Sequence, residues 1–317
     1  MNKSDLLEKL SLALRVPAAE LEKMLNNAPY RYRHYQIKKR TGGWRDIYQP
    51  TASLKEVQRW LIRECFASLP VSDAVFSYRA GLGIKDHALA HSKSNYFLRL
   101  DFTDFFPSIG GVELFLYLKN MRSLGKIALD DEALNFSVNC LCRKKDDAHG
   151  LKGLSLTIGA PSSPYLSNSI IYEFDEFMLR AASNSGGIYT RYADDIYISS
   201  KEIWPSKKME EQARSALSRY APFLKINEYK VRRFSRKRRV NICGLNITSI
   251  RNVSVGRDVK KLIRAKIDYA MNDRLDKKEL ESLRGWLSYV ESIEPGYISK
   301  NSERVGVDLF DQKINKK

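Results

Sequence analysis

The chain has 317 residues, which is long enough for a large hydrophobic core divided among two or three small subdomains. Lys and Arg number 54 against 37 Asp and Glu, and this net charge of +17 points to an acidic partner, usually nucleic acid. No apolar run approaches the roughly 18 residues needed to span a membrane, and the four cysteines show no disulfide framework, which together indicate a cytoplasmic protein.

The N-terminal half predicts helix, hairpin, helix and strand in this order. Helical periodicity dominates residues 4–27, with charges that break the pattern of a signal peptide. Residues 30–50 alternate as strands do, on either side of a turn at Thr41–Gly43. Residues 54–69 return to helical spacing, and residues 95–106 predict a strand that stops at Pro107.

Mixed helix and loop are expected from there to residue 158, and the remainder alternates again between helices and strands. We expect helices at 163–182 and 206–221, a hairpin at 188–200, a strand at 240–247 and a mainly helical tail from residue 257. Strands interleaved with helices, and antiparallel where hairpins occur, predict an α+β fold.

Two adjacent aspartates, Asp194 and Asp195, lie between the two β-prone halves of the stretch IYTRYADDIYISS. Asp is a favoured turn residue, so an ordinary turn is the simplest interpretation. Two anions this close, however, raise each other's pKa unless a cation neutralises them. Hard divalent cations with oxygen ligands, above all Mg²⁺, meet that need and are usually shared with substrate phosphates.

A third carboxylate is expected from a neighbouring strand, and Asp101 in LRLDFTDFF supplies it. An acid after apolar Leu98 and Leu100 is costly to bury without a partner, although it can also cap a turn at the edge of a sheet. For Asp104 a local cap is nearly as good an interpretation. Three carboxylates around two Mg²⁺ ions are what nucleotidyl transfer requires, since one ion activates the attacking hydroxyl and the other neutralises the pyrophosphate.

Basic residues around the turn at 41–43 are candidate ligands of a triphosphate, although such charges are often only a solvated face. They are Lys38, Lys39, Arg40 and Arg45.

Cys140 and Cys142, with His149 nearby, match no common zinc spacing, so we expect the cysteines to be small buried hydrophobes.

Five segments in this order resemble the motifs of reverse transcriptases, and specifically of bacterial retron reverse transcriptases, over residues 30–290. YADD at 192–195 resembles the catalytic hairpin, and LDFTDFF at 100–106 resembles the first catalytic strand. GAPSSP at 159–164 resembles the segment that packs against the incoming nucleotide and the template. IKKRTGGWRDIYQP at 37–50 resembles the fingers hairpin, and NICGLNI at 241–247 resembles the primer grip.

The resemblance implies a right-hand polymerase with fingers, a palm built on an antiparallel sheet, and a compact helical thumb. The implied domains are N-terminal helices at 1–29, fingers at 30–95 with a contribution from 130–165, a palm at 96–129 and 166–239, and the primer grip with the thumb or RNA-binding region at 240–317.

The resemblance also implies roles for individual residues. Asp101, Asp194 and Asp195 would be the catalytic metal ligands, and the ring of Phe106 would exclude a ribose 2′-hydroxyl. Lys230 matches a family lysine near the triphosphate. The full expected nucleotide-binding set is Lys39, Arg45, Asp104, Phe105, Phe106, Ile158, Gly159 and Lys230.

This sequence departs from the family pattern at three places. Ile158 stands where the family usually has Gln, which predicts altered fidelity or nucleotide discrimination. The retron Asn-Ala-x-x-His motif begins with His87 here and keeps His91, and these histidines are as well explained as a helix face without a ligand role. The family's Val-Thr-Gly is Ile242-Cys243-Gly244.

The C-terminal part combines a basic run, KVRRFSRKRR at 230–239, with a helix whose core stripe is Val259, Ile263 and Ile267. We expect its basic faces to bind a hybrid or A-form duplex through phosphates and 2′-hydroxyls. The expected RNA- and primer-binding residues are Arg232, Arg233, Arg236, Lys237, Gly244, Lys260, Lys261 and Arg264.

Taken together, the resemblance implies an enzyme that uses dNTPs and two Mg²⁺ ions, with Mn²⁺ as a substitute, to copy part of a cognate structured non-coding RNA into single-stranded DNA. Priming from an RNA 2′-hydroxyl would give a branched RNA–DNA, and an effector or toxin protein would link the enzyme to anti-phage defence in the bacterial cytoplasm. The alternatives are a reverse transcriptase of group II intron or diversity-generating type, and a catalytically silent RNA-binding scaffold.

Overall fold

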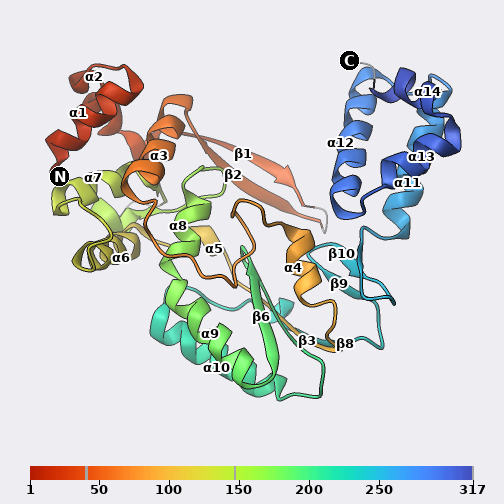
Figure 1. Cartoon of the computed structure of the whole chain (residues 1–317). Helices are drawn as coiled ribbons and strands as arrows, with labels where there is room; N and C mark the ends of the chain where they lie inside the picture. The colour runs from red at the N-terminus through yellow and green to blue at the C-terminus, as the bar shows by residue number, and fades with distance from the viewer. Residues whose placement is uncertain (40–41, 146–147, 316–317) are drawn as a thin grey trace.

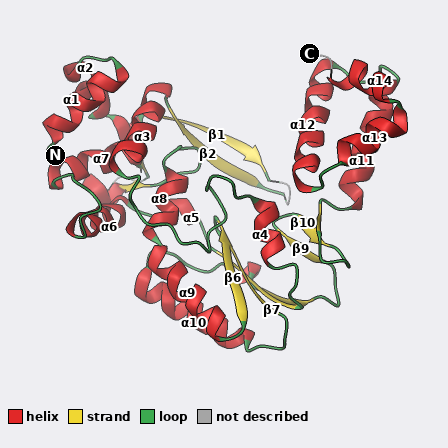
Figure 2. Cartoon of the chain, viewed as in Figure 1, coloured by secondary structure: helices red, strands yellow, loops and turns green. Residues whose placement is uncertain are grey.

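A four-stranded antiparallel sheet lies at the centre of the computed structural model, which describes residues 1–39, 42–145 and 148–315. In the strand order β6-β7-β3-β8, the bounds are β6 Gly187–Tyr192, β7 Asp195–Ser200, β3 Tyr96–Asp101 and β8 Arg232–Ser235. Figures 1 and 2 show helices α9 and α10 beside this sheet. The mixture of helices and antiparallel strands confirms the predicted α+β class.

The alternation of side chains along β3 and β7 gives the sheet two different faces. Leu98 and Leu100 lie in the same core cluster as residues of α9 and α10, whereas Phe97 and Tyr197 lie in a second core cluster with the C-terminal region. Because residues two apart share a face, Arg99 and Asp101 belong to the face of Phe97, away from α9 and α10.

The N-terminal segment predicted as helix at 4–27 forms two helices. Arg15 ends the first with φ 56°, a left-handed conformation, and Pro17 follows without an amide hydrogen to continue it. The elements from the N-terminus to residue 90 are α1 Lys3–Leu14, α2 Ala18–Leu25, η1 Ala28–Tyr30, β1 Tyr32–Lys38, β2 Trp44–Pro50, α3 Ala52–Cys65 and α4 Ile84–Ala90.

The predicted hairpin at 30–50 is confirmed, because β1 and β2 pair antiparallel from Tyr32 with Pro50 to Lys38 with Trp44. Lys39 N donates to the Gly43 carbonyl at 2.9 Å and closes the strand pair. Arg40 and Thr41 of the predicted turn lie outside the described residues. In Figure 1 the hairpin extends from the N-terminal helices toward the C-terminal ones.

The strand predicted at 95–106 is wrong in its second half, because β3 ends at Asp101. Asp104 has φ 44°, which no strand residue adopts, and Pro107 then lies inside a helical turn. The elements that follow are α5 Phe105–Ser108, α6 Gly111–Ser123, α7 Asp131–Leu141, β4 Arg143–Lys144, η2 Gly150–Gly153 and β5 Leu154–Ser155.

The helix predicted at 163–182 is also interrupted, since Ile171, with φ −107° and ψ 20°, leaves the helical region between two helices. These are α8 Ser163–Ile170 and α9 Tyr172–Asn184, and they precede the β6–β7 hairpin. The predicted helix at 206–221 is α10 Ser206–Tyr220, followed by η3 Glu228–Lys230.

The strand predicted at 240–247 is a small hairpin, because Cys243 and Gly244 both have positive φ and reverse the chain. The elements of the C-terminal region are β9 Val240–Ile242, β10 Leu245–Ile247, β11 Val253–Ser254, α11 Arg257–Met271, α12 Lys277–Ile293, α13 Tyr297–Val305, α14 Val307–Phe310 and η4 Asp311–Asn315. Ile263 and Ile267 are buried, as the periodicity predicted.

Two clusters of buried apolar side chains stabilise the molecule. One joins the N-terminal helices, α6, α7, α9 and α10 to one face of the central sheet, and the other joins the sheet's opposite face to β9–β11 and the C-terminal helices. Within the described residues, no helix has both the length and the apolar character required to cross a membrane.

Candidate active site

The three predicted acids meet at one end of the central sheet. Asp101, the last residue of β3, pairs directly with Asp195, the first residue of β7. Cross-strand partners place their side chains on the same face. Asp194 lies in the two-residue turn between β6 and β7, where Phe102 N donates to the Asp194 carbonyl at 3.1 Å. Strand pairing therefore brings together Asp101 and Asp195, which are 94 positions apart in the sequence.

Two cations of the chain neutralise two of these acids. Lys230 Nζ lies 2.7 and 2.9 Å from the carboxylate oxygens of Asp101. Arg99 donates twice to Asp195 Oδ1, from Nε at 2.9 Å and from Nη2 at 2.6 Å. Among the described residues, no such ion pair involves Asp194.

Burial is the main reason that the pKa values of two acids exceed their ordinary range. It raises the pKa of Asp101 to about 6; the charges of Asp194 and Asp195 act in the same direction, and the Lys230 hydrogen bond opposes them. Burial and the charge of Asp195 also raise the pKa of Asp194. This end of the sheet is therefore a site where added positive charge stabilises the ionised acids.

The donor chemistry of this cluster fits a hard divalent cation, because it consists of closely spaced carboxylate oxygens with raised pKa values. In the described part of the chain, however, no three acidic, His or Cys side chains are arranged as metal ligands. Asp101 and Asp195 are paired instead with Lys230 and Arg99.

A cavity of about 530 Å³ lies beside the acids and collects most of the predicted nucleotide-binding residues. Those that line it, together with Asp194, are Lys39, Arg45, Asp104, Phe105, Phe106, Ile158 and Lys230. Gly159 does not line it, yet a Cβ at this position would lie 2.8 Å from the Tyr48 carbonyl oxygen. Only glycine permits this approach of β2, which forms one wall of the cavity.

The two adjacent phenylalanines point in different directions. Phe105 is buried and stacks on Phe102, with ring centroids 5.5 Å apart, whereas Phe106 is partly exposed beside the cavity. The ring of Tyr78 lies 6.4 Å from that of Phe106 and lines the same cavity. Asp104 occupies the N-cap position of α5, but its side chain makes no capping hydrogen bond.

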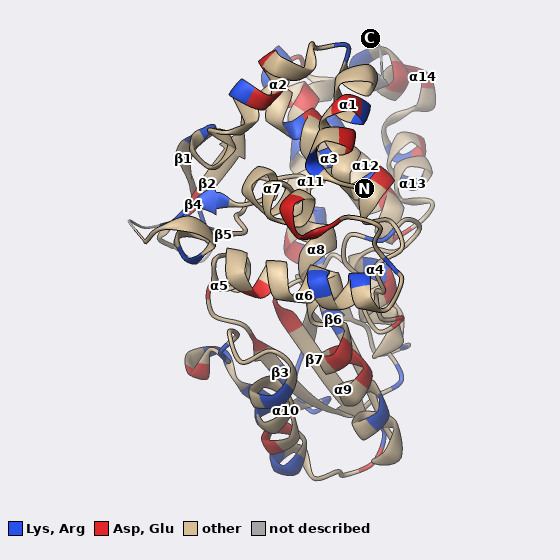
Figure 3. Ribbon diagram, turned by 90° about the vertical axis from the view of Figure 1, so that its left-hand side faces the viewer, with Lys and Arg blue, Asp and Glu red and all other residues tan. Residues whose placement is uncertain are grey.

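Several cavity residues were not predicted from the sequence, above all Tyr78, Arg143 and Lys145. Arg143 lies over the ring of Tyr48, with its guanidinium carbon 3.7 Å from the ring centroid. Figure 3 shows Lys and Arg along the β1–β2 hairpin and the neighbouring β4–β5 segment. Strands of two residues, such as β4 and β5, are too short to show a periodic pattern in the sequence. Arg143 and Lys145 could therefore be recognised as cavity residues only from the three-dimensional structure.

The predicted RNA- and primer-binding residues fall into two groups. Arg236 donates to the Ser92 and Thr248 carbonyls, Arg233 pairs with Glu210, and Lys260 pairs with Glu294, so these three also hold the protein together. The other predicted residues are exposed or lie in turns: Arg232 on β8, Lys237 beyond it, Gly244 in the β9–β10 turn, and Lys261 and Arg264 on α11.

The histidines of the modified motif lie in the interior, where they join α4 to the β6–β7 hairpin. His91 is hydrogen-bonded through Nδ1 to Ser199 at 2.7 Å and through Nε2 to Thr190 at 2.6 Å, and His87 Nδ1 also contacts Thr190. Burial lowers the pKa of His91 to about 3, so the ring is neutral at physiological pH.

Cys140 and Cys142 are buried in the first core cluster, as expected of small hydrophobes.

Comparison with known proteins identifies the family of the chain. The family model for reverse transcriptase, an RNA-dependent DNA polymerase, matches residues 37–247. The chain is thus a reverse transcriptase, an enzyme with fingers, palm and thumb whose chemistry depends on divalent metal ions.

More specifically, the chain belongs to the retron reverse transcriptases. It is 32% identical over 311 residues to the retron Ec86 reverse transcriptase of Escherichia coli, covering 95% of this chain and 90% of that protein. It is 30% identical over 277 residues to the retron Ec83 reverse transcriptase of the same species, covering 87% of each. A solved apo telomerase from Candida tropicalis aligns with a TM-score of 0.48 at 10% identity, covering 90% of this chain and 58% of the telomerase.

Proposed function

We propose that Asp101, Asp194 and Asp195 hold two Mg²⁺ ions, with Mn²⁺ as a substitute, and that the chain joins dNTPs to a growing DNA strand at this site. The observation that supports this most directly is the register that places Asp101 opposite Asp195, with Asp194 lining the adjacent cavity. Bound ions would supply activation of the attacking hydroxyl and neutralisation of the departing pyrophosphate.

The cavity residues have separate tasks in this proposal. Lys39 and Arg45 bind the triphosphate from the β1–β2 hairpin, as charge-assisted hydrogen bonds favour. Phe106 packs against the sugar and excludes a 2′-hydroxyl. Lys230 forms an ion pair with Asp101 and also lines the cavity. In this proposal it leaves Asp101 to bind a phosphate oxygen, or it protonates the departing pyrophosphate. Phe105, Asp104, Ile158 and Gly159 shape the walls and the approach of β2.

We propose further that the template and primer are parts of one structured non-coding RNA. Family membership supports synthesis from an RNA 2′-hydroxyl to give a branched RNA–DNA, and an association with an effector protein in anti-phage defence in the bacterial cytoplasm. In this proposal the fingers, palm and thumb span the residue ranges that the resemblance implies. The exposed cations on β8 and α11 contact the RNA backbone.

The acids are tested by Asp194→Asn and Asp195→Asn, with Asp308→Asn on exposed α14 as the matched control. We expect the first two variants to lose cDNA synthesis while RNA binding and the control remain unchanged. Wild-type cDNA from Asp194→Asn would remove the metal assignment.

The subtype is tested by expressing the gene with its flanking DNA and sequencing the nucleic acid that copurifies. Short single-stranded DNA joined 2′–5′ to RNA supports the retron reaction. Free linear cDNA would favour an intron or diversity-generating reaction, and RNA alone would favour the scaffold.

A further inference from the structure

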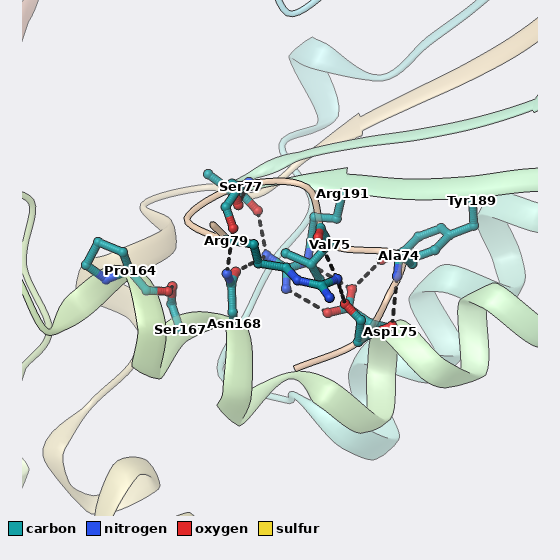
Figure 4. Close-up of polar contacts among 12 residues, drawn as sticks. Ala74, Val75, Ser77, Arg79, Pro164, Ser167, Asn168, Asp175, Tyr189 and Arg191 are labelled. Carbon is teal, nitrogen blue, oxygen red and sulfur yellow. Dashed lines mark hydrogen bonds and ion pairs between the residues drawn. The ribbon is translucent and has the colours of Figure 1, made fainter. Parts of the chain in front are cut away.

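A buried ion pair lies next to the turn between β6 and β7, and neither of its residues lines the cavity beside the acids. Arg191 and Asp175 are both fully buried, and their side chains meet twice, at 2.9 Å between Nε and Oδ1 and at 2.6 Å between Nη2 and Oδ2. Tyr189 donates its hydroxyl to Asp175 Oδ1 at 2.6 Å (Figure 4). Burying two charges gives little net stability compared with apolar packing, so the value of this pair lies in the geometry that it fixes.

The backbone of Ala193, immediately before Asp194, is held by this cluster from both sides. Arg191 Nη1 donates to the Ala193 carbonyl at 2.9 Å, and Ala193 N donates to Ser77 Oγ at 2.8 Å. Asn168 accepts from Arg191 at 3.1 Å and donates to the Ser77 carbonyl at 3.0 Å, which closes the cluster. Ala193 has φ 55°, a conformation that a residue other than glycine keeps only when its surroundings enforce it.

The same cluster reaches the nucleotide cavity through the segment before α4. Arg191 N donates to the Ala74 carbonyl and Phe76 N donates to the Arg191 carbonyl, both at 2.9 Å, so this segment pairs with β6. Ser77 follows, and the next residue is Tyr78, which lines the cavity. One set of buried bonds therefore fixes both the turn that carries Asp194 and part of the cavity wall.

We propose that Ser77, Asn168, Asp175 and Arg191 are positioning residues that hold the carboxylate of Asp194 where it ligates the catalytic divalent ion. This inference rests on the proposed metal role of Asp194. None of the four lines the cavity, so they act through the backbone of the turn. Weakening the cluster lowers the affinity for the ion and the rate at a given ion concentration, and leaves RNA binding intact.

Ser77→Ala is the sharpest variant, because it removes one acceptor from Ala193 N and leaves no unpaired charge. Ser167→Ala is its matched control: Ser167 is equally buried in the same region, but its hydroxyl bonds the Pro164 carbonyl of its own helix (Figure 4). Tyr189→Phe is a second variant, which removes only the hydroxyl that contacts Asp175.

The primary readout is Mn²⁺ binding to the full chain, measured by electron paramagnetic resonance without nucleotide. The second readout is the rate of single-nucleotide primer extension, measured at increasing Mg²⁺ concentration. We expect Ser77→Ala to weaken Mn²⁺ binding and to raise the half-maximal Mg²⁺ concentration, each about fivefold or more. Ser167→Ala should stay within twofold of wild type, and raised Mg²⁺ should recover much of the lost rate. Melting curves check that all variants fold.

The outcomes separate this inference from the proposed function. If Ser77→Ala and Ser167→Ala bind Mn²⁺ alike while Asp194→Asn binds none and is inactive, the cluster has no positioning role and the metal assignment stands. If Asp194→Asn binds Mn²⁺ and extends primers as wild type does, the metal assignment fails and the inference fails with it. Should Ser77→Ala not fold, Tyr189→Phe is expected to weaken Mn²⁺ binding because it removes a hydrogen bond that holds Asp175 against Arg191, and an unchanged affinity overturns the positioning role of this ion pair.

Discussion

The two acids of the catalytic turn differ in their surroundings, although they are neighbours in the sequence. Asp195 accepts two hydrogen bonds from Arg99, whereas burial and the charge of Asp195 raise the pKa of Asp194. An acid without a close cation gains more from a divalent ion than one that is already paired. If the proposed metal role is correct, we therefore expect a bound divalent ion to stabilise the charge of Asp194 more than that of Asp195.

Phe106 is expected to select deoxyribonucleotides. Its partly exposed ring borders the cavity beside Tyr78, so Phe106→Ala makes room for a 2′-hydroxyl. An apolar pocket discriminates against an added hydroxyl by about 100-fold. The ratio of kcat/KM for dNTP over rNTP, measured on one template, should therefore decrease by up to about 100-fold in the variant. Unchanged sugar selectivity would exclude Phe106 as the selecting residue.

His91 should make the stability of the protein depend on pH. Its pKa is about 3 in the folded state and near 6.5 when exposed, so between these values the unfolded state binds more protons. The free energy of unfolding should therefore fall as the pH drops below 6.5, by about 1.4 kcal/mol at pH 5.5 from this residue.

Urea unfolding of wild type and His91→Gln at pH 7.5 and 5.5 measures this contribution. The variant is expected to be less stable at pH 7.5, because the bridge from Thr190 to Ser199 is disturbed, but to lose less stability between the two pH values. Equal losses in the two proteins would show that His91 does not titrate in this way.

At the scale of elements, the β1–β2 hairpin brings its cations to the cavity because its base is attached to the segment at 158–159. Tyr48 N donates to the Ile158 carbonyl at 2.8 Å, and Gly159 lets the two backbones approach. Arg45→Ala should raise the KM for dNTP by about 10-fold or more, since a charge-assisted phosphate contact is lost.

Arg33→Ala is the matched control for this hairpin. Arg33 is exposed on β1 and pairs with Gln49 near the base of the hairpin, away from the turn. Steady-state kinetics should give a KM within twofold of wild type for this control. A similar rise in both variants would indicate a general weakening of the hairpin and not a contact with the triphosphate.

Elements with strong periodicity or turn signals were predictable from the sequence, and backbone reversals inside continuous patterns were not. The hairpin at 30–50 and the acids at 101, 194 and 195 follow from alternation and from the cost of buried charge. The breaks at Asp104, Ile171 and Cys243 do not, because the strand or helix pattern of the neighbouring residues continues across them. Arg143 joins the cavity only through tertiary contact with Tyr48, which local pattern does not encode.

The molecule has a net charge of +17, and exposed Lys and Arg side chains also lie away from the three acids, on α11 for example. The exposed cations of α11, Lys261 and Arg264, are expected to contact RNA phosphates. Each lost contact lowers the slope of log affinity against log salt by about one unit. A Lys261→Ala, Arg264→Ala double variant should therefore bind RNA with a slope reduced by about two.

Filter binding or fluorescence anisotropy from low to moderate salt measures the slope. Lys207→Ala with Lys208→Ala removes the same charge from α10, which packs on α9 behind the sheet, and is the control. Equal slopes for the two double variants would mean that only net charge matters and that α11 is not part of the RNA-binding surface.

The attachment of the fingers hairpin also has an evolutionary consequence. Because the bond from Tyr48 reaches the backbone of residue 158 and not its side chain, the side chain there is free to vary while the hairpin stays anchored. That side chain lines the cavity beside the acids, so we expect a substitution there to change substrate choice with little penalty to folding. Position 158 is accordingly the natural starting point for a saturation library aimed at new nucleotide preferences.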